Sequence, residues 1–422
     1  MKSLELALKS APLVYVTRDL ERARGLSSQT SNYYIITNRA STTKRDEAHD
    51  QNILSISEKA KLDTHKLLKH PKTISFLAGL TNPRLLVFKN TTAIEKICRE
   101  HRWTLLNPPA ELANIVEEKI SQITWLGELK EMLPLHRVTI CQELTWTGVP
   151  YIIQFNRAHT GSGTILVENK NQIIILRNTF PRREVRVTKF ISGPVFTNNV
   201  VVWGKNILSG PLNYQITGLT PFTKLPFATV GNDWELQRKT LTKKQLKDFE
   251  TMTIKVGKRL AAAGWKGLCG LDMVVEEKTG KIYLLEVNAR QPASTTYESQ
   301  LQSQNRPKNI ITTFEAHLAA LLDLPYKNEK IISLKTGSQI IQRVTADVTS
   351  ITKDTLKKLT KLQAGYILYQ NNISGADLLR IQLKKGIMMG HSIFNALGIE
   401  IAYACDPNKQ NHSELCVGGK TN

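Results

Sequence analysis

Cysteine is scarce in this sequence, and no two cysteines have the spacing of a metal or redox pair. The five in 422 residues include no C-x-x-C motif. An odd number without such pairs argues against a disulfide framework and against a zinc knuckle, and it favours a reducing compartment. We therefore expect a cytoplasmic protein. The five positions are Cys98, Cys141, Cys269, Cys405 and Cys416.

Long apolar runs are also missing. The N-terminal stretch M-K-S-L-E-L-A-L-K-S-A-P places Glu5 and Lys9 where a secretory signal needs an unbroken apolar region. No run approaches the length of a membrane-spanning helix. The sequence thus predicts neither a signal peptide nor a membrane span, and we expect no membrane partner.

Acidic residues are few relative to basic ones. The chain has 57 Lys and Arg against 36 Asp and Glu, a formal net charge of +21. Such a charge favours anionic partners without choosing among RNA, a membrane surface, a nucleotide and an acidic metabolite. The basic residues are scattered through predicted helices, as in residues 242–259, with no basic tail or aromatic-interleaved stripe. Most of this charge is expected at solvated surface, so nucleic-acid binding is disfavoured.

The first third alternates strand-like and helix-like segments. Strands are predicted at residues 13–17, 33–38 and 84–89, with helical stretches between them and a helix from about residue 91. This alternation predicts a parallel sheet with crossover helices, a Rossmann-like α/β domain. No G-x-G-x-x-G follows the first strand, so the dinucleotide-binding fingerprint is missing.

From about residue 138 the pattern changes to consecutive β-rich runs separated by turn residues. We predict an antiparallel, α+β region that includes Q-I-I-I-L, residues 172–176, as one of its strands. Thr242 and Gln245 then form a capping box that predicts the start of a long helix, which stops at Gly264.

A β-hairpin follows that helix. The arms L-D-M-V-V-E-E and K-I-Y-L-L-E-V-N flank K-T-G, which suits a three-residue loop with its glycine in the left-handed position. That loop pairs Glu277 with Lys281. Counting back in register places Asp272 directly opposite Glu286, with Asn288 two residues further along the same face.

Two facing carboxylates repel each other, and burial raises at least one carboxyl pKa unless a cation lies between them. Magnesium prefers oxygen ligands, so two acids and an amide without histidine or thiolate fit Mg²⁺, or Mn²⁺ in its place. The alternative is a hairpin whose acids point at water. The apolar neighbours in L-L-E-V-N-A-R favour the metal interpretation because they bury this sheet.

The segments Gly270-Leu271-Asp272 and Glu286-Val287-Asn288-Ala289-Arg290 resemble the metal-binding strands of the ATP-grasp superfamily of carboxylate-amine and related ligases. The resemblance covers about residues 105–325. It implies a Rossmann-like pre-ATP-grasp domain, an ATP-grasp fold with antiparallel sheets, and a smaller C-terminal α+β segment. The expected limits are 1–118, 119–325 with a lid subdomain at about 138–204, and 326–422.

The resemblance also implies roles for particular residues. Asp272, Glu286 and Asn288 would hold two magnesium ions that bridge nucleotide phosphates. Lys119 would reach the ATP phosphates, and Arg290 would contact a transferring phosphate or an acyl phosphate. Both are therefore candidate catalytic residues.

A strand and glycine-rich lid, followed by a hinge strand, would bind the rest of the nucleotide. Glycines in the lid permit close approach of backbone N–H groups to phosphate oxygens. The alternatives are an ordinary hairpin turn for the lid and a core position for the hinge phenylalanine. The implied ATP-binding residues are Lys119, Gln154, His159, Thr160, Gly161, Ser162, Gly163, Thr164, Lys189, Phe190 and Ile191.

The sequence departs from the pattern at two positions. Gln154 stands where a lysine is usual, and Thr188 where a glutamate is common. Glutamine keeps a hydrogen bond to phosphate but loses a charge, so either Lys119 and neighbouring arginines compensate or activity is reduced. Arg186, with Arg182 and Arg183, could bind an anionic substrate or be a solvated strand charge.

The resemblance implies an ADP-forming, ATP- and Mg²⁺-dependent ligase that activates a carboxylate as an acyl phosphate for attack by an amine. Its partners would be a small-molecule carboxylate and amine, and a homo-oligomer is compatible with the sequence. The alternatives are a catalytically reduced ATP-binding regulatory protein and, less favoured, a nucleic-acid-binding protein. The polar loop at residues 291–299 either meets substrate or lies at the surface, and His159, His317 and His391 are expected to be structural.

Overall fold

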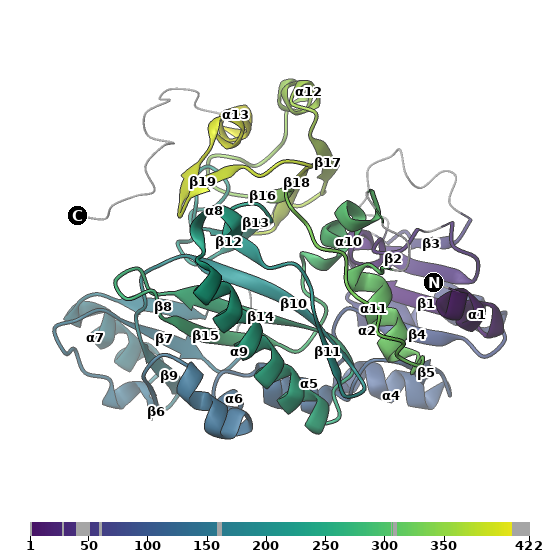
Figure 1. Cartoon of the computed structure of the whole chain (residues 1–422), viewed down its shortest axis with the longest axis horizontal. Coiled ribbons are helices and arrows are strands. Elements are labelled where there is room, and N and C mark those ends of the chain that lie inside the picture. The colour runs from purple at the N-terminus through teal and green to yellow at the C-terminus, as the bar shows by residue number, and fades with distance from the viewer. Residues whose placement is uncertain are drawn as a thin grey trace.

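The computed structural model describes residues 2–27, 29–38, 51–58, 61–157, 163–304, 306 and 310–406. Figure 1 shows three regions around a central sheet: an N-terminal α/β unit, a lid on the opposite side, and a C-terminal region above. The combination of a parallel sheet with antiparallel sheets confirms the predicted mixed α/β and α+β fold class. The domain limits given above remain predictions.

The N-terminal sheet is parallel, with the strand order β3-β2-β1-β4-β5. This order confirms the Rossmann-like prediction, and it places β1 and β4 side by side at the point where the strand order reverses. The strands are β1 (Leu13–Thr17), β2 (Tyr33–Asn38), β3 (Ile53–Ile56), β4 (Arg84–Val87) and β5 (Thr104–Leu105). The helices are α1 (Lys2–Ser10), η1 (Leu20–Ala23), α2 (Thr64–Lys69), α3 (Pro71–Ala78) and α4 (Thr92–Glu100).

The lid sheet is antiparallel, with the order β6-β9-β7-β8. One of its faces is covered by α7, which buries Ile173 and Leu176 against the sheet. The lid elements are β6 (His136–Ile140), η4 (Cys141–Glu143), β7 (Tyr151–Phe155), β8 (Thr164–Val167), α7 (Lys170–Thr179) and β9 (Glu184–Lys189).

The strand predicted at residues 172–176 is wrong, because these residues lie within α7. Asn169 and Gln172 form a capping box at the start of this helix, each side chain bonding the other's backbone N–H. A run of isoleucines has high β propensity, but the cap and the burial of Ile173 and Leu176 on one face determine a helix here.

The central sheet has nine strands in the order β15-β14-β10-β12-β13-β16-β18-β17, with β11 paired to β10. It includes β10, which falls inside the predicted lid range, and three strands from the C-terminal segment. The strands are β10 (Val195–Trp203), β11 (Asn206–Ser209), β12 (Asn213–Thr217), β13 (Thr229–Asp233), β14 (Gly267–Val275), β15 (Ile282–Asn288), β16 (Ser338–Arg343), β17 (Gly365–Leu368) and β18 (Asp377–Leu383).

Helix α9 packs against one face of this sheet, with Phe249, Val256 and Leu260 in the main core (Figure 1). Its predicted capping box, Thr242 with Gln245, is confirmed. The opposite face of β10 and β14 packs against α11. Because side chains alternate along a strand, Asp272 points to the face away from α9.

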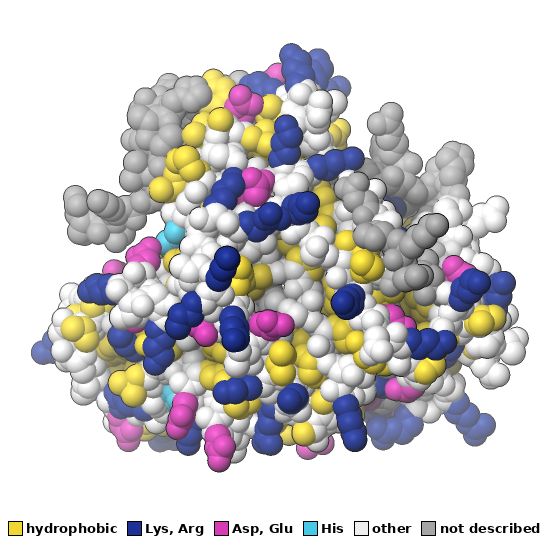
Figure 2. All heavy atoms as spheres, viewed as in Figure 1, with side chains coloured by type: hydrophobic (Ala, Val, Ile, Leu, Met, Phe, Trp, Pro, Cys, Tyr) yellow, Lys and Arg dark blue, Asp and Glu magenta, His cyan; other side chains and the backbone are white. Residues whose placement is uncertain are grey.

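The other described elements connect or cover these sheets. They are α5 (Ala110–Glu117), α6 (Ser121–Leu126), η3 (Gly127–Met132), α8 (Gln237–Thr240), α9 (Lys243–Ala262), α10 (Thr295–Gln304), α11 (Thr313–Leu321), α12 (Lys353–Lys361), β19 (Met388–Gly390), β20 (Ile393–Phe394) and α13 (Ala396–Cys405). No helix in the described ranges has the length and apolar character needed to cross a membrane. On the face of the molecule that Figure 2 shows, Lys and Arg side chains are dispersed among acidic side chains.

Candidate functional site

The hairpin formed by β14 and β15 places the predicted carboxylates opposite each other. Asp272 is the register partner of Glu286, and Gly270 is the partner of Asn288. On its other side Asp272 is paired with Thr197 of β10. The predicted facing pair is confirmed, with Asn288 on the same face.

The predicted turn of this hairpin is wrong by one residue. The N–H of Glu276 donates to the carbonyl of Lys281 at 2.9 Å, and that of Gly280 to the carbonyl of Glu276 at 2.7 Å, so the loop has four residues. A β-bulge between Asp272 and Met273 leaves Leu285 without a register partner. The bulge restores the pairing that a three-residue loop would have given.

Hydrogen bonds hold the two carboxylates close together. The Nδ2 group of Asn288 donates to Oδ2 of Asp272 and to Oε1 of Glu286, both at 2.9 Å. The hydroxyl of Thr197 donates to Oδ1 of Asp272 at 2.7 Å. An amide nitrogen therefore lies between the two acids, where a cation would offset their repulsion.

Lys119 lies at this site, beside Glu286. Its Nζ forms an ion pair with Oε2 of Glu286. The segment is fixed to the end of β7, since the N–H of Lys119 donates to the carbonyl of Asn156 at 3.2 Å. Lys119 is 8% exposed, so its charge acts at short range in a place partly shielded from water.

The two carboxyl groups have opposite pKa shifts. Burial, followed by the charge of Glu286, raises the pKa of Asp272 to about 7. Burial also acts to raise the pKa of Glu286, but the Lys119 charge and hydrogen bonds outweigh it and hold that pKa well below its usual range. One cation thus neutralises one of two adjacent acids, and the pair still lacks positive charge.

Arg290 extends this line of polar groups. Its Nη2 donates to Oδ1 of Asn288 at 2.9 Å, and its Nε to Oε1 of Glu117 at 2.9 Å. Glu117 also forms an ion pair with Lys89. The site therefore runs from Lys119 through the two acids and Asn288 to Arg290, with Glu117 fixing its far end.

These residues fit a hard divalent cation. The described residues contain no group of three or more His, Cys, Asp and Glu placed to hold a metal. The site offers two facing carboxylates and the amide oxygen of Asn288, which also accepts from Arg290. Magnesium is commonly held by one or two carboxylates and completes its coordination with phosphates and water. The deficit of positive charge at Asp272 is the local feature that such an ion would remove.

The lid contributes Gln154 and the residues after β7. Gln154 is partly exposed and pairs with Thr164 of β8 and Arg186 of β9. The carbonyl of Gly163 accepts from the N–H of Phe155 at 3.0 Å. The predicted ATP-binding residues His159, Thr160, Gly161 and Ser162 lie outside the described residues.

Strand β9, the predicted hinge strand, ends at the predicted adenine-binding residues. Lys189 is half exposed, and its Nζ forms an ion pair with Oε1 of Glu276 at 3.0 Å. Phe190 is partly buried and Ile191 is buried. These three residues lie between the lid sheet and the central sheet, and their contacts with a nucleotide remain a prediction.

The solvated alternative holds for Arg182 and Arg183, which are exposed, but two surface alternatives are wrong for other residues. Arg186 is only 2% exposed, so it is not a solvated strand charge. Residues 291–299 do not form a surface loop, since Gln291 is 3% exposed and α10 begins at Thr295. His317 is structural as expected, because its Nδ1 accepts from the N–H of Leu268 at 2.9 Å.

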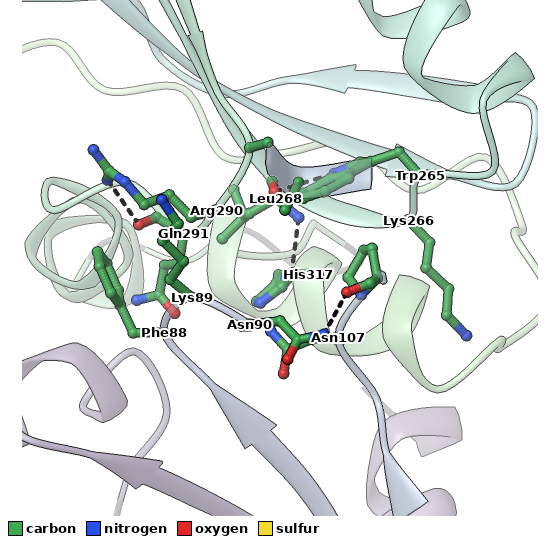
Figure 3. A pocket seen from close by; sticks show the side chains of 13 residues that line it. Phe88, Lys89, Asn90, Asn107, Trp265, Lys266, Leu268, Arg290, Gln291 and His317 are labelled. Carbon is green, nitrogen blue, oxygen red and sulfur yellow. Dashed lines mark hydrogen bonds between the residues drawn. The ribbon is translucent and has the colours of Figure 1, made fainter. Parts of the chain in front are cut away.

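A second set of residues, which the sequence did not indicate, lies beside Arg290. Figure 3 shows a pocket between the loop after β4 and the ends of β14 and β15, with Arg290 next to Phe88 and Lys89. The guanidinium carbons of Arg22 and Arg290 lie 4.3 Å and 5.4 Å from the centre of the Phe88 ring. Nη1 of Arg22 is buried without a hydrogen-bond partner among the described residues. These contacts join distant segments, so no local motif could reveal them.

Comparison with known proteins identifies the fold. No protein-family model matches the chain, and no curated protein matches its sequence. Solved structures do match. The N5-carboxyaminoimidazole synthase of Aspergillus clavatus, in complex with ADP and 5-aminoimidazole ribonucleotide, has a TM-score of 0.62 at 16% identity, covering 89% of this chain and 94% of that one.

Two further solved structures are similar to the same extent. The L-amino acid ligase of Bacillus licheniformis has a TM-score of 0.63 at 12% identity, covering 89% of this chain and 93% of that one. The N5-carboxyaminoimidazole synthetase of Staphylococcus aureus, complexed with ADP, has a TM-score of 0.61 at 12% identity, with the same coverage. The chain therefore has the ATP-grasp fold of these ligases.

Proposed function

We propose that this protein is a Mg²⁺- and ATP-dependent carboxylate-amine ligase that forms ADP. The observation that carries the proposal is the convergence of Asp272, Glu286 and Asn288 with Lys119 and Arg290. Carboxylates that could hold a divalent cation and positively charged side chains that could contact phosphate lie together on the face of the central sheet opposite α9. The ATP-grasp fold supports the same reaction class.

The chemistry explains why both kinds of charge are needed. A carboxylate is a poor acylating agent because its leaving group would be oxide. Transfer of the γ-phosphoryl group forms a bond from the carboxylate oxygen to phosphorus and breaks the bond to the ADP oxygen. Attack by the amine on the acyl carbon then releases inorganic phosphate and a proton.

The protein would position charge and would not supply a nucleophile. Mg²⁺ held by Asp272, Glu286 and Asn288 would offset the charge of the nucleotide phosphates. Arg290, which is fixed by Glu117 and Asn288, would contact the acyl phosphate through its guanidinium. Lys119 is held by Glu286 within the same site.

The residues beside Arg290 are our candidate site for the acid substrate. In open parallel sheets, ligands bind outside the carboxyl ends of the strands, at the point where strand order reverses. Arg22 follows β1 and Phe88 follows β4, the two strands at that point. The guanidinium groups of Arg22 and Arg290 both lie close to the Phe88 ring, so a carboxylate bound there would meet two positive charges.

The test is release of ADP in a screen of carboxylates paired with amines. The screen should include 5-aminoimidazole ribonucleotide among the amines and L-amino acids among both substrates, because the similar solved structures are a synthase complexed with that ribonucleotide and an L-amino acid ligase. We expect one pair to drive ADP release. Asp272→Asn and Glu286→Gln should each lower that rate by about 100-fold or more, since each removes charge from the phosphate site.

Asp323→Asn is the matched control, because this exposed acid forms its ion pair with Lys266, away from the two facing carboxylates. ADP release that survives both Asp272→Asn and Glu286→Gln would refute the proposed site. Tight ATP binding without turnover for any pair would instead favour the ATP-binding regulatory protein.

A further inference from the structure

Arg186 and Gln154 lie side by side on the face of the lid sheet that points away from α7. They are register partners on β9 and β7. Val185, Val187 and Ile153, their sequence neighbours, belong to the core that α7 covers. Because side chains alternate along each strand, Gln154 and Arg186 share the opposite face.

Arg186 is a buried cation with neutral partners. Its Nε and Nη2 donate to Oε1 of Gln154 at 2.9 Å and 2.6 Å, and its Nη1 to Oε1 of Gln122 at 3.3 Å. Its Nη2 also donates to the carbonyl of Leu285 at 3.1 Å. Burial lowers the pKa of Arg186 to about 10, so the group stays charged at neutral pH.

A buried charge usually lies beside an opposite charge, because removing it from water is costly. All the hydrogen bonds that the structure gives Arg186 end on neutral oxygens. Leu285 is the residue left unpaired by the β-bulge, next to Glu286. The bulge thus presents the Leu285 carbonyl to Arg186 and brings the guanidinium charge near Glu286.

The contact with Arg186 also determines which way the Gln154 amide points. A guanidinium can only donate, so the atom of Gln154 that faces it must be oxygen. Both N–H donors of Nε2 therefore lie on the side away from the guanidinium. Gln154 is partly exposed whereas Arg186 is 2% exposed, so the amide, and not the guanidinium, is available to a ligand.

We propose that Arg186 is a positioning residue for the nucleotide phosphates. It fixes the Gln154 amide with its N–H donors toward the phosphates, and its charge polarises those donors in a site of low dielectric constant. The inference rests on the proposed ATP-dependent function, and it gives the glutamine at position 154 a specific task. The neutral amide of Gln154, which is partly exposed, would thus act together with the buried guanidinium of Arg186.

The test is a cycle of variants at the two positions, with the dissociation constants of ATP, ADP and adenosine measured by calorimetry in Mg²⁺. Arg186→Met should weaken ATP and ADP binding by about 10- to 100-fold, the effect of losing a hydrogen bond supported by charge. Adenosine binding should be unchanged because it has no phosphate. Arg177→Met, at a lid arginine that bonds the Leu144 carbonyl, is the matched control.

The second part of the experiment moves the positive charge from position 186 to position 154. Gln154→Lys should lower ATP affinity when Arg186 is present, since two cations then face each other across the strands. In the Arg186→Met background, the same Gln154→Lys change should restore ATP affinity to within about 5-fold of the wild type, because the cation is supplied directly. If Arg186 had only a packing role, Gln154→Lys would change ATP affinity in the same direction in both backgrounds.

Gln154→Met provides a reading if Arg186→Met does not fold, because Gln154 is partly exposed and Arg186 stays in place. It should weaken ATP binding by about 10-fold. Wild-type protein that binds no ATP would overturn both the proposed function and this inference. Wild-type protein that binds ATP, with no loss in Gln154→Met or no rescue by Gln154→Lys, would overturn this inference alone.

Discussion

At the residue scale, Glu298 is a buried carboxyl group surrounded by neutral donors. Its Oε2 accepts from Nδ2 of Asn199 at 2.9 Å and from Nε1 of Trp234 at 3.0 Å, and Oε1 lies 2.6 Å from the hydroxyl of Thr313. Burial raises its pKa to about 8. Glu286 differs because Lys119 compensates its charge. Glu298 is therefore protonated at neutral pH, whereas Glu286 is ionised.

The pKa of Glu298 predicts a pH dependence of stability. The pKa of Glu298 rises from an ordinary 4.5 to about 8 on folding. The protonated carboxyl group therefore stabilises the folded state fully below pH 4.5, and this stabilisation is lost as the pH rises toward 8. The loss approaches about 1.4 kcal/mol per pH unit over that window. Glu298→Gln should flatten the decline in unfolding free energy measured by urea denaturation between pH 5 and 8.

Glu128→Gln, at an exposed acid, is the control and should keep the wild-type pH profile. Parallel profiles for the wild type and Glu298→Gln would show that Glu298 is ionised in the folded protein at neutral pH.

Arg186 shows what residue-scale sequence reasoning could not reach. The segment V-R-V-T alternates apolar and polar residues, which predicts one buried face and one exposed face. Val185 and Val187 do face the lid core. The other face is covered by the β15 strand of the central sheet, so the arginine is buried too. Alternation predicts which residues share a face but not what covers it.

At the element scale, the pairing of Asp272 with Glu286 was predicted correctly although the predicted turn was wrong. The turn has one more residue than expected, and a β-bulge at Leu285 removes the shift before Asp272. Turn chemistry at K-T-G predicts a loop but does not fix its length, and nothing in the sequence marks the bulge. The sequence therefore predicts that Asp272 faces Glu286, but it does not predict the pairing of the residues between them and the turn.

The hinge between lid and central sheet gives a second prediction at this scale. Gly193 has φ of +149°, and a Cβ there would lie 1.9 Å from the carbonyl oxygen of Val275. Gly193→Ala should lower the free energy of unfolding by about 3 kcal/mol, since it combines a glycine-only backbone conformation with a steric clash. Urea denaturation measures this loss.

Gly204→Ala is the matched control. Gly204 also has positive φ, at +60°, but a Cβ there meets nothing within 4 Å. Its cost should be about 1 kcal/mol, the strain of the left-handed conformation alone. Equal losses in the two variants would contradict the close approach of the hinge to β14.

At the scale of the whole molecule, the candidate site joins segments that are far apart in the chain. Lys119 meets Glu286 across 167 positions, and Arg290 meets Glu117 across 173. The order of the domains along the chain could be predicted, because strands and helices have periodic sequence patterns and because residues 270–272 and 286–290 resemble a known superfamily. The contact between Arg290 and Phe88 could not be predicted, since only the docking of the N-terminal sheet creates it.

The central claim, activation of a carboxylate by ATP, is tested most directly by following oxygen. The carboxylate that drives ADP release is labelled with ¹⁸O and incubated with the wild-type protein, Mg²⁺, ATP and the amine. An acyl phosphate must leave a carboxylate oxygen on phosphorus, so we predict a single labelled oxygen in each inorganic phosphate, measured by mass spectrometry. ADP formation with unlabelled phosphate would mean that water, and not the carboxylate, receives the phosphoryl group, and it would contradict the account.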